Sequence, residues 1–154
     1  MNIQNLISAF EENFREYARI LREIEDEEDI NGSHGMELNT KEFLHQLTKI
    51  EDEVFEFRLK KILDEEHPYI PQINVDNIKR TISFFDLEIS EIIQQFLHQR
   101  KELLKILYSI PRTYWNRTGV HEVEGHVEFK EFVRRVTKRD KDILNRFNSM
   151  EQIN

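Results

Sequence analysis

The sequence predicts an all-α protein, a four-helix bundle with a long connection between its third and fourth helices. The residues that interrupt helices are few, four Gly and three Pro, and they stand in three clusters. The clusters separate four segments, and each segment carries apolar residues at steps of three and four, which places them on one helical face. Four such helices bury their apolar faces by packing as a bundle. The clusters are Gly32 with Gly35, Pro68 with Pro71, and Pro111 with Gly119 and Gly125.

The first two helices follow from their apolar stripes. The first stripe runs from Ile3 to Ile24, and the acidic run Glu25 to Asp29 is expected to form a solvated helix end and to lead into the loop. The second helix is predicted to begin near Asn39 or Thr40, either of which suits an N-cap. It ends before "HPYIP", because a residue that precedes proline is disfavoured in helical backbone. Its stripe consists of Phe43, Leu47, Ile50, Val54 and Phe57.

The third helix is predicted from about Asp76 to Ser109 and the fourth from about Glu128 to Phe147. Gln99 interrupts the apolar stripe of the third helix. In the fourth helix, the step that should fall at 139 or 140 finds Arg139 and Asp140 instead of an apolar residue. The remaining stripe of the fourth helix consists of Phe129, Phe132, Val136, Ile143 and Phe147.

Length and composition limit the class of protein. The 154 residues fit one domain, residues 1–154, and eleven Phe argue against disorder. The net charge of −8 argues against a nucleic-acid binder, which needs a basic surface. The absence of Cys excludes disulfides and thiolate chemistry of the chain's own. No apolar run is long enough to span a membrane and no signal peptide is evident, so a cytoplasmic protein is expected.

The stretch "TGVHEVEGHVEF" holds two histidines in the long connection between the third and fourth helices. His121 and His126 are five residues apart, which matches neither His-Glu-x-x-His nor its inverse. Gly119 and Gly125 predict a loop here. The favoured interpretation is histidines satisfied by backbone or solvent, while an alternative metal site formed by His45, His121 or His126 stays open.

Four stretches, taken in order, resemble the DinB-like family. They are "FEFRLKKIL" (Phe55 to Leu63), "HPYIPQINVD" (His67 to Asp76), "FLHQRKELLKIL" (Phe96 to Leu107) and "YWNRTGVHEVEGHVEFKEFV" (Tyr114 to Val133). The last contains the family's Trp-x-Arg…His…Gly segment as Trp115, Arg117, His121 and Gly125. The likeness covers roughly residues 40–147.

The resemblance implies a four-helix bundle from a metal-binding superfamily. Relatives bind a divalent metal through one His of the second helix and two of the fourth, four residues apart, and some use it in reactions with small thiols. The resemblance places these ligand positions at Leu47, Arg139 and Ile143, so this chain departs from the pattern at each of them. It therefore implies a member without the three-His site and without a cofactor.

Arg139 is the unusual residue among these inward-facing positions. An unpaired buried guanidinium is costly. Our hypothesis is that Arg139 pairs with Glu51 or Asp52 in the cleft where relatives hold the metal. The alternative is that Arg139 reaches solvent over the edge of the core.

Three functions remain open at this level. The first is a binding or structural module with a degenerate metal site, compatible with a homodimer through helix faces. The second is a thiol-dependent transferase or isomerase in which Arg139 binds an anionic substrate and His121 acts as base. The third is a stress-regulated partner protein. The catalytic residues and the small-molecule ligand stay unknown.

Overall fold

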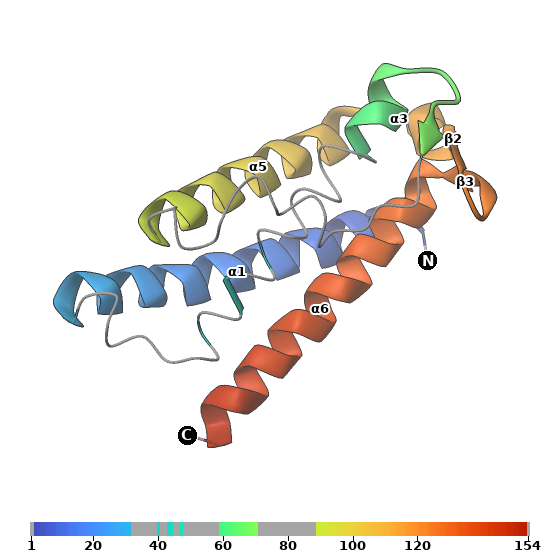
Figure 1. Cartoon of the computed structure of the whole chain (residues 1–154). Coiled ribbons are helices and arrows are strands. Elements are labelled where there is room, and N and C mark those ends of the chain that lie inside the picture. Colours follow the sequence, from blue (N-terminus) through green and yellow to red (C-terminus); the bar gives the residue numbers. More distant parts are fainter. Residues whose placement is uncertain are drawn as a thin grey trace.

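The structure is a computed structural model, and it describes residues 2–31, 40, 43–44, 47, 59–70 and 89–153. The long helices in this part are α1 (Ile3–Asn31), α5 (Ile89–Ser109) and α6 (Phe129–Ile153), and α1 packs against both α5 and α6 (Figure 1). A short helix, α3, spans Lys60–Asp64. The fold is the predicted all-α four-helix bundle, with a small sheet added at one end.

In the described part of the chain, the predicted apolar stripes form the core. In each described helix the residues three and four apart are the buried ones, and each buried Leu, Ile or Phe contributes about 1.5–3 kcal/mol to stability. Helical Phe43, Leu44 and Leu47 join this core. The buried stripe residues of the long helices are Leu6, Phe10, Tyr17, Leu21, Ile24, Ile92, Phe96, Leu103, Leu107, Phe129, Phe132, Val136, Ile143 and Phe147.

Three boundaries differ from the prediction. The acidic run Glu25 to Asp29, expected to form a solvated helix end and loop, is helical throughout, because α1 continues to Asn31. Glutamate is a good helix former, and no helix breaker occurs before Gly32. Thr40 is already helical, and α6 extends six residues past Phe147 to Ile153. The predicted start of the third helix at Asp76 lies outside the described residues.

The connection between α5 and α6 is not a plain loop. It contains a 3-10 helix at Arg112–Asn116 and the strands β2 (Thr118–His121) and β3 (Gly125–Glu128), which form an antiparallel hairpin. The two-residue strand β1 (Tyr69–Ile70) pairs in parallel with β2, which gives the order β1-β2-β3. The two histidines predicted in a loop therefore stand on strands, His121 at the end of β2 and His126 in β3.

Two glycines and one tryptophan fix this small sheet against the bundle. A Cβ on Gly119 would lie 2.7 Å from Ile70 Cγ1, so only glycine lets β2 approach β1 this closely. Gly125, at φ 79°, follows the hairpin turn in the left-handed backbone that glycine favours. Trp115 is buried edge-on against Phe129 at 5.4 Å between ring centroids, which ties the connection to the first turn of α6.

None of the helices in the described ranges combines the length and the apolar content that crossing a membrane requires.

Candidate functional site

A charged network lies in the middle of the bundle. Asp140 of α6 is fully buried, and Arg100 of α5 is 2 % exposed. Arg100 donates through Nη1 to Asp140 Oδ2 at 2.5 Å and through Nη2 to Oδ1 at 3.2 Å, a two-point contact. The Tyr17 hydroxyl of α1 donates to Asp140 Oδ1 at 2.8 Å. Three helices thus meet on one carboxylate, and both of its oxygens accept hydrogen bonds.

The surroundings of this network are aromatic. The Arg100 guanidinium carbon lies 5.1 Å from the centroid of the Phe96 ring and 5.6 Å from that of Phe10. Such contacts stabilise a cation that has lost its water. On the neighbouring turn, the buried Asn13 side chain donates to the backbone oxygen of Thr137 at 3.0 Å. The polar groups that join α1 to α6 here are paired, as buried polar groups must be.

The three positions that the resemblance assigns to metal ligands do not share one environment. Leu47 is 1 % exposed and Ile143 is 8 % exposed, so both face the core as expected. The expectation that Arg139 faces inward is wrong, because its side chain is exposed to solvent. The inward step of α6 after Val136 falls at Asp140, and Arg139 is about 100° further round the helix.

The proposed pairing of Arg139 lies outside what the structure describes. Glu51 and Asp52, the expected partners and cleft residues, are not among the described residues, and neither is His45. The pairing was expected because an unpaired buried charge is costly. Since Arg139 is exposed to solvent, that argument no longer applies. The pairing itself stays a prediction.

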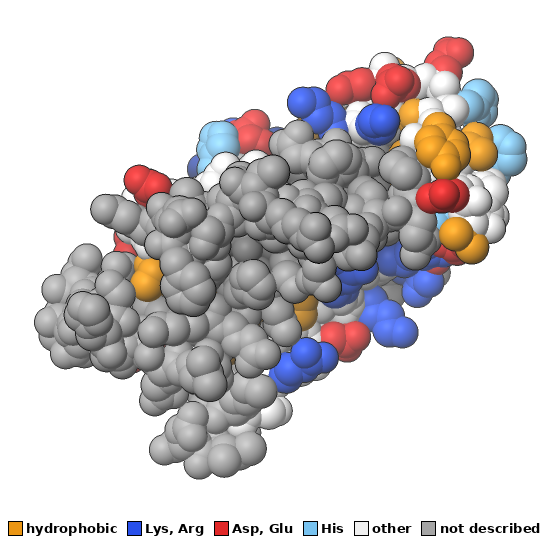
Figure 2. All heavy atoms as spheres, in the orientation of Figure 1, with side chains coloured by type: hydrophobic (Ala, Val, Ile, Leu, Met, Phe, Trp, Pro, Cys, Tyr) orange, Lys and Arg blue, Asp and Glu red, His pale blue; other side chains and the backbone are white. Residues whose placement is uncertain are grey.

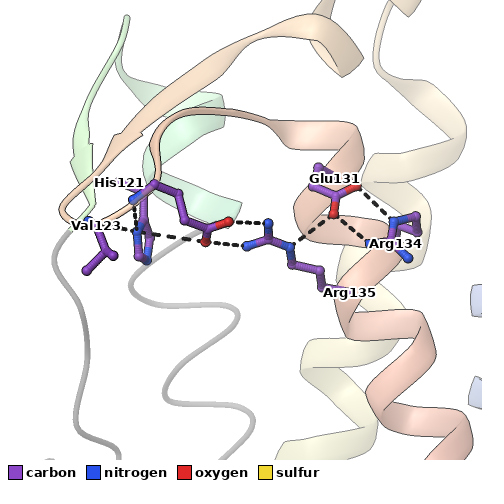
Figure 3. A network of polar contacts seen from close by, with 6 residues as sticks. His121, Val123, Glu131, Arg134 and Arg135 are labelled. Atoms are coloured by element: carbon purple, nitrogen blue, oxygen red, sulfur yellow. Dashed lines mark hydrogen bonds and ion pairs between the residues drawn. The ribbon is translucent and has the colours of Figure 1, made fainter.

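His121 is satisfied by the backbone, as the favoured interpretation of the sequence expected. It is 5 % exposed, and its Nδ1 accepts the backbone N–H groups of Val123 at 3.1 Å and Glu124 at 3.2 Å (Figure 3). Both backbone N–H groups meet the ring at the same nitrogen, which also lies 3.9 Å from Glu124 Oε2. The ring organises the hairpin turn, and its Nδ1 is not available as a general base.

A second charged network lies on the surface between this turn and α6. Arg135 forms a two-point contact with Glu124, at 2.6 and 2.7 Å, and also donates to Glu131 at 3.1 Å (Figure 3). Arg134 donates twice to Glu131, at 2.7 and 2.8 Å. The four side chains form a continuous chain from the hairpin to the second turn of α6. We call them the surface network.

The surface network shifts the protonation of its members. The hydrogen bonds from Arg134 and then Arg135 hold the pKa of Glu131 at about 2, although partial burial opposes this. The hydrogen bond with Glu124 raises the pKa of Arg135 above its ordinary value. These four side chains line part of a pocket of about 540 Å³. The rest of its lining is formed by Leu6, His126, Val127, Glu128 and Lys130. Its charged side chains are three cations and three carboxylates.

The described residues at the bundle centre do not fit the metal that the resemblance implies. Leu47 and Ile143 offer only hydrocarbon, and a guanidinium has donors but no acceptor. Asp140 is the inward carboxylate nearest to these positions in sequence, and Arg100 already neutralises it. The described ranges contain no group of three His, Cys, Asp or Glu placed to hold a metal ion.

Comparison with known proteins shows the fold. No family model matches the chain, and no curated protein does. Among solved structures, YfiT from Bacillus subtilis superimposes with a TM-score of 0.72 over 97% of this chain and 86% of its own, at 12% identity. It is described as a probable metal-dependent hydrolase with an unusual four-helix bundle topology. At this identity the two proteins share a fold, and no more follows.

The buried pair was visible in the sequence only as two irregularities. Arg100 follows Phe96 by four residues and precedes Leu103 by three, so it occupies a stripe position next to the interrupting Gln99. Asp140 has the same place between Val136 and Ile143. Two opposite charges on the apolar stripes of two helices are the signal that could have identified this pair.

Proposed function

We propose that this chain is a DinB-like bundle that works as a binding or structural module, with a buried ion pair in place of a metal centre. Support comes from the order of the four sequence stretches, from the shared bundle fold, and from the chemistry of the inward-facing side chains. Degenerate ligand positions at Leu47 and Ile143 are filled by hydrocarbon and contribute to the core.

The observation that carries the proposal is that Asp140 is buried and that both of its carboxylate oxygens accept hydrogen bonds. A catalytic carboxylate must reach a substrate or a water molecule with a free lone pair. The carboxylate of Asp140 is 0 % exposed, and Arg100 and Tyr17 hold both of its oxygens. It therefore joins three helices and is sealed from substrate. The centre of the bundle provides stability and a fixed arrangement of helices.

Binding is then a property of the surface, and the pocket beside the surface network is a candidate site for it. Its guanidinium groups are held in place by carboxylates, so they lose little further freedom when a partner arrives. Arg135 is about one-third exposed and Arg134 about one-half exposed, at 34% and 48%. Charges of both signs suit a partner segment that is itself zwitterionic.

The competing hypothesis is an enzyme. YfiT is described as a probable metal-dependent hydrolase, and the shared fold makes this chemistry a candidate here too. A thiol-dependent transferase or isomerase of the DinB-like type is the other form of this alternative. Either would need donors other than Leu47, Arg139 and Ile143 to hold its metal.

Metal content separates the two hypotheses. The chain is purified without a polyhistidine tag, and bound metal is measured by mass spectrometry together with thermal unfolding before and after addition of Zn²⁺, Ni²⁺ or Mn²⁺. The module predicts no tightly held stoichiometric metal. One ion per chain that survives dialysis and is also retained by the His67→Asn/His126→Thr variant would contradict it, because that variant lacks the surface histidines discussed next.

A further inference from the structure

We infer that His67 and His126 form a surface site for one divalent ion of the zinc, nickel or copper type. His67 precedes β1, and His126 lies in β3, on the other side of β2. Their rings come together with 6.2 Å between centroids and 88° between planes. Both side chains are exposed. Figure 2 shows histidine side chains gathered at the end of the molecule.

The distance between the rings suits two imidazoles on one ion. A metal held at about 2.1 Å by a ring nitrogen lies roughly 3.2 Å from the ring centroid, so two imidazoles on one ion have centroids roughly 5 to 6.4 Å apart. The observed separation of 6.2 Å falls within this range. Side-chain rotations that turn one nitrogen of each ring toward a common point would place an ion between the rings.

One ring nitrogen of His67 has a polar partner on β2. Its Nδ1 lies 3.1 Å from Thr118 Oγ1, which leaves Nε2 for an ion. Ligand histidines commonly bind a neighbour through the second ring nitrogen, which fixes the ring. The backbone of His67 has φ 46°, unusual for a residue other than glycine. Pro68 follows at once and its oxygen accepts from Val120 N at 2.7 Å, so the strained residue is anchored to β2.

The donor set defines the class of ion. Neutral imidazoles favour zinc, nickel and copper over magnesium or calcium, which prefer oxygen. Since no third His, Cys, Asp or Glu joins the pair in the described ranges, water completes the coordination and binding is reversible. The net charge of −8 raises the local concentration of divalent cations. This site is separate from the bundle centre, where the relatives hold their metal.

The test is calorimetric titration of the untagged full chain with Zn²⁺. His67→Asn is the suitable variant, because asparagine tolerates left-handed backbone, and His126→Thr suits a strand. We expect one ion per chain, and at least about a tenfold loss of affinity in each variant, in the range found when metal-site contacts are removed. His98→Ala, which removes an exposed histidine of α5, is the matched control and should leave affinity unchanged.

A second measurement protects the test against loss of fold. Zn²⁺ should raise the Tm of the wild type and of His98→Ala, and should leave that of His126→Thr unchanged, because only a ligand that binds the folded state stabilises it. Thr118→Val should weaken binding less than either histidine change. The inference is overturned if wild type binds no Zn²⁺, if both histidine variants bind as wild type does, or if His98→Ala weakens binding as much as they do.

Discussion

Two of the arginine–carboxylate networks in the described part of the chain have similar geometry in opposite environments. Arg100 and Asp140 have side chains 3% and 0% exposed, whereas Arg135 and Glu124 are 34% and 42% exposed. Both pairs make two-point contacts at short distance. In water such a pair contributes about 0–1 kcal/mol. In the core, removing one partner leaves a charge without solvent, so the same contact becomes a strong constraint on the fold.

The largest expected effect comes from breaking the buried pair on one side. Asp140→Ala leaves the guanidinium of Arg100 buried and unpaired, which should lower the free energy of unfolding by about 3–5 kcal/mol. Urea unfolding followed by circular dichroism measures this loss. Asp142→Ala, two residues further along α6 and exposed, is the control and should change stability by less than about 0.5 kcal/mol.

Removing both charges sharpens the interpretation. Arg100→Met combined with Asp140→Leu replaces the pair with apolar side chains of related size, and should restore most of the stability that Asp140→Ala loses. The same unfolding experiment on Arg100→Met, on Asp140→Leu and on the double variant gives the coupling energy. A double variant as unstable as Asp140→Ala would show that Asp140 matters for a reason other than its charge partner.

Tyr17→Phe has a smaller expected effect. It removes the 2.8 Å hydrogen bond to Asp140 Oδ1 and keeps the ring in the core. A hydrogen bond to a charged group contributes about 1.5–3 kcal/mol, and we expect a loss near the lower value because Arg100 still holds the carboxylate. The chemical denaturation midpoint measures it. A change no larger than that of Tyr108→Phe, an exposed tyrosine bonded to Glu11, would contradict the buried network's importance.

Breaking the surface network should change stability little. Arg135→Ala removes the contacts with Glu124 and Glu131, and we expect a loss of at most about 1 kcal/mol. Because these groups are exposed, the loss should shrink further in about 1 M salt, where the Debye length is about 3 Å. Arg146→Ala, also exposed on α6, is the control. A loss as large as that of Asp140→Ala would remove the contrast between the two networks.

The smallest expected effect is the change in stability when Glu131 is protonated at low pH. The pKa of Glu131 is lowered from 4.5 to about 2 in the folded state, so its contribution to stability is fully present above about pH 4.5 and is lost as pH falls toward 2. Glu131→Gln removes this contribution. The difference in unfolding free energy between wild type and variant should therefore decrease over that window. Above about pH 4.5 the difference in unfolding free energy should stay constant. A difference that increases on acidification would contradict the prediction.

The helices and their buried faces could be predicted because the information is local. Steps of three and four identified Leu21, Phe96 and Phe132 as core residues without knowledge of any other helix. The hairpin was missed because β2 and β3 are four residues each, and β1 adds only two residues from a distant part of the chain. Strands this short contain too few residues for an alternation of apolar and polar side chains to be recognised in the sequence.

The sequence by itself determined an all-α bundle, the stripes that form its core, and the two irregular positions in them. Tertiary structure alone decided which charge faced inward, because adjacent residues such as Arg139 and Asp140 differ by about 100° around a helix. It also decided that Asp140 meets Arg100, 40 residues earlier, and Tyr17, 123 residues earlier. The physical reason is that helical periodicity is set by neighbours in the chain, whereas the partner of a buried charge is set by the rotation and packing of whole helices.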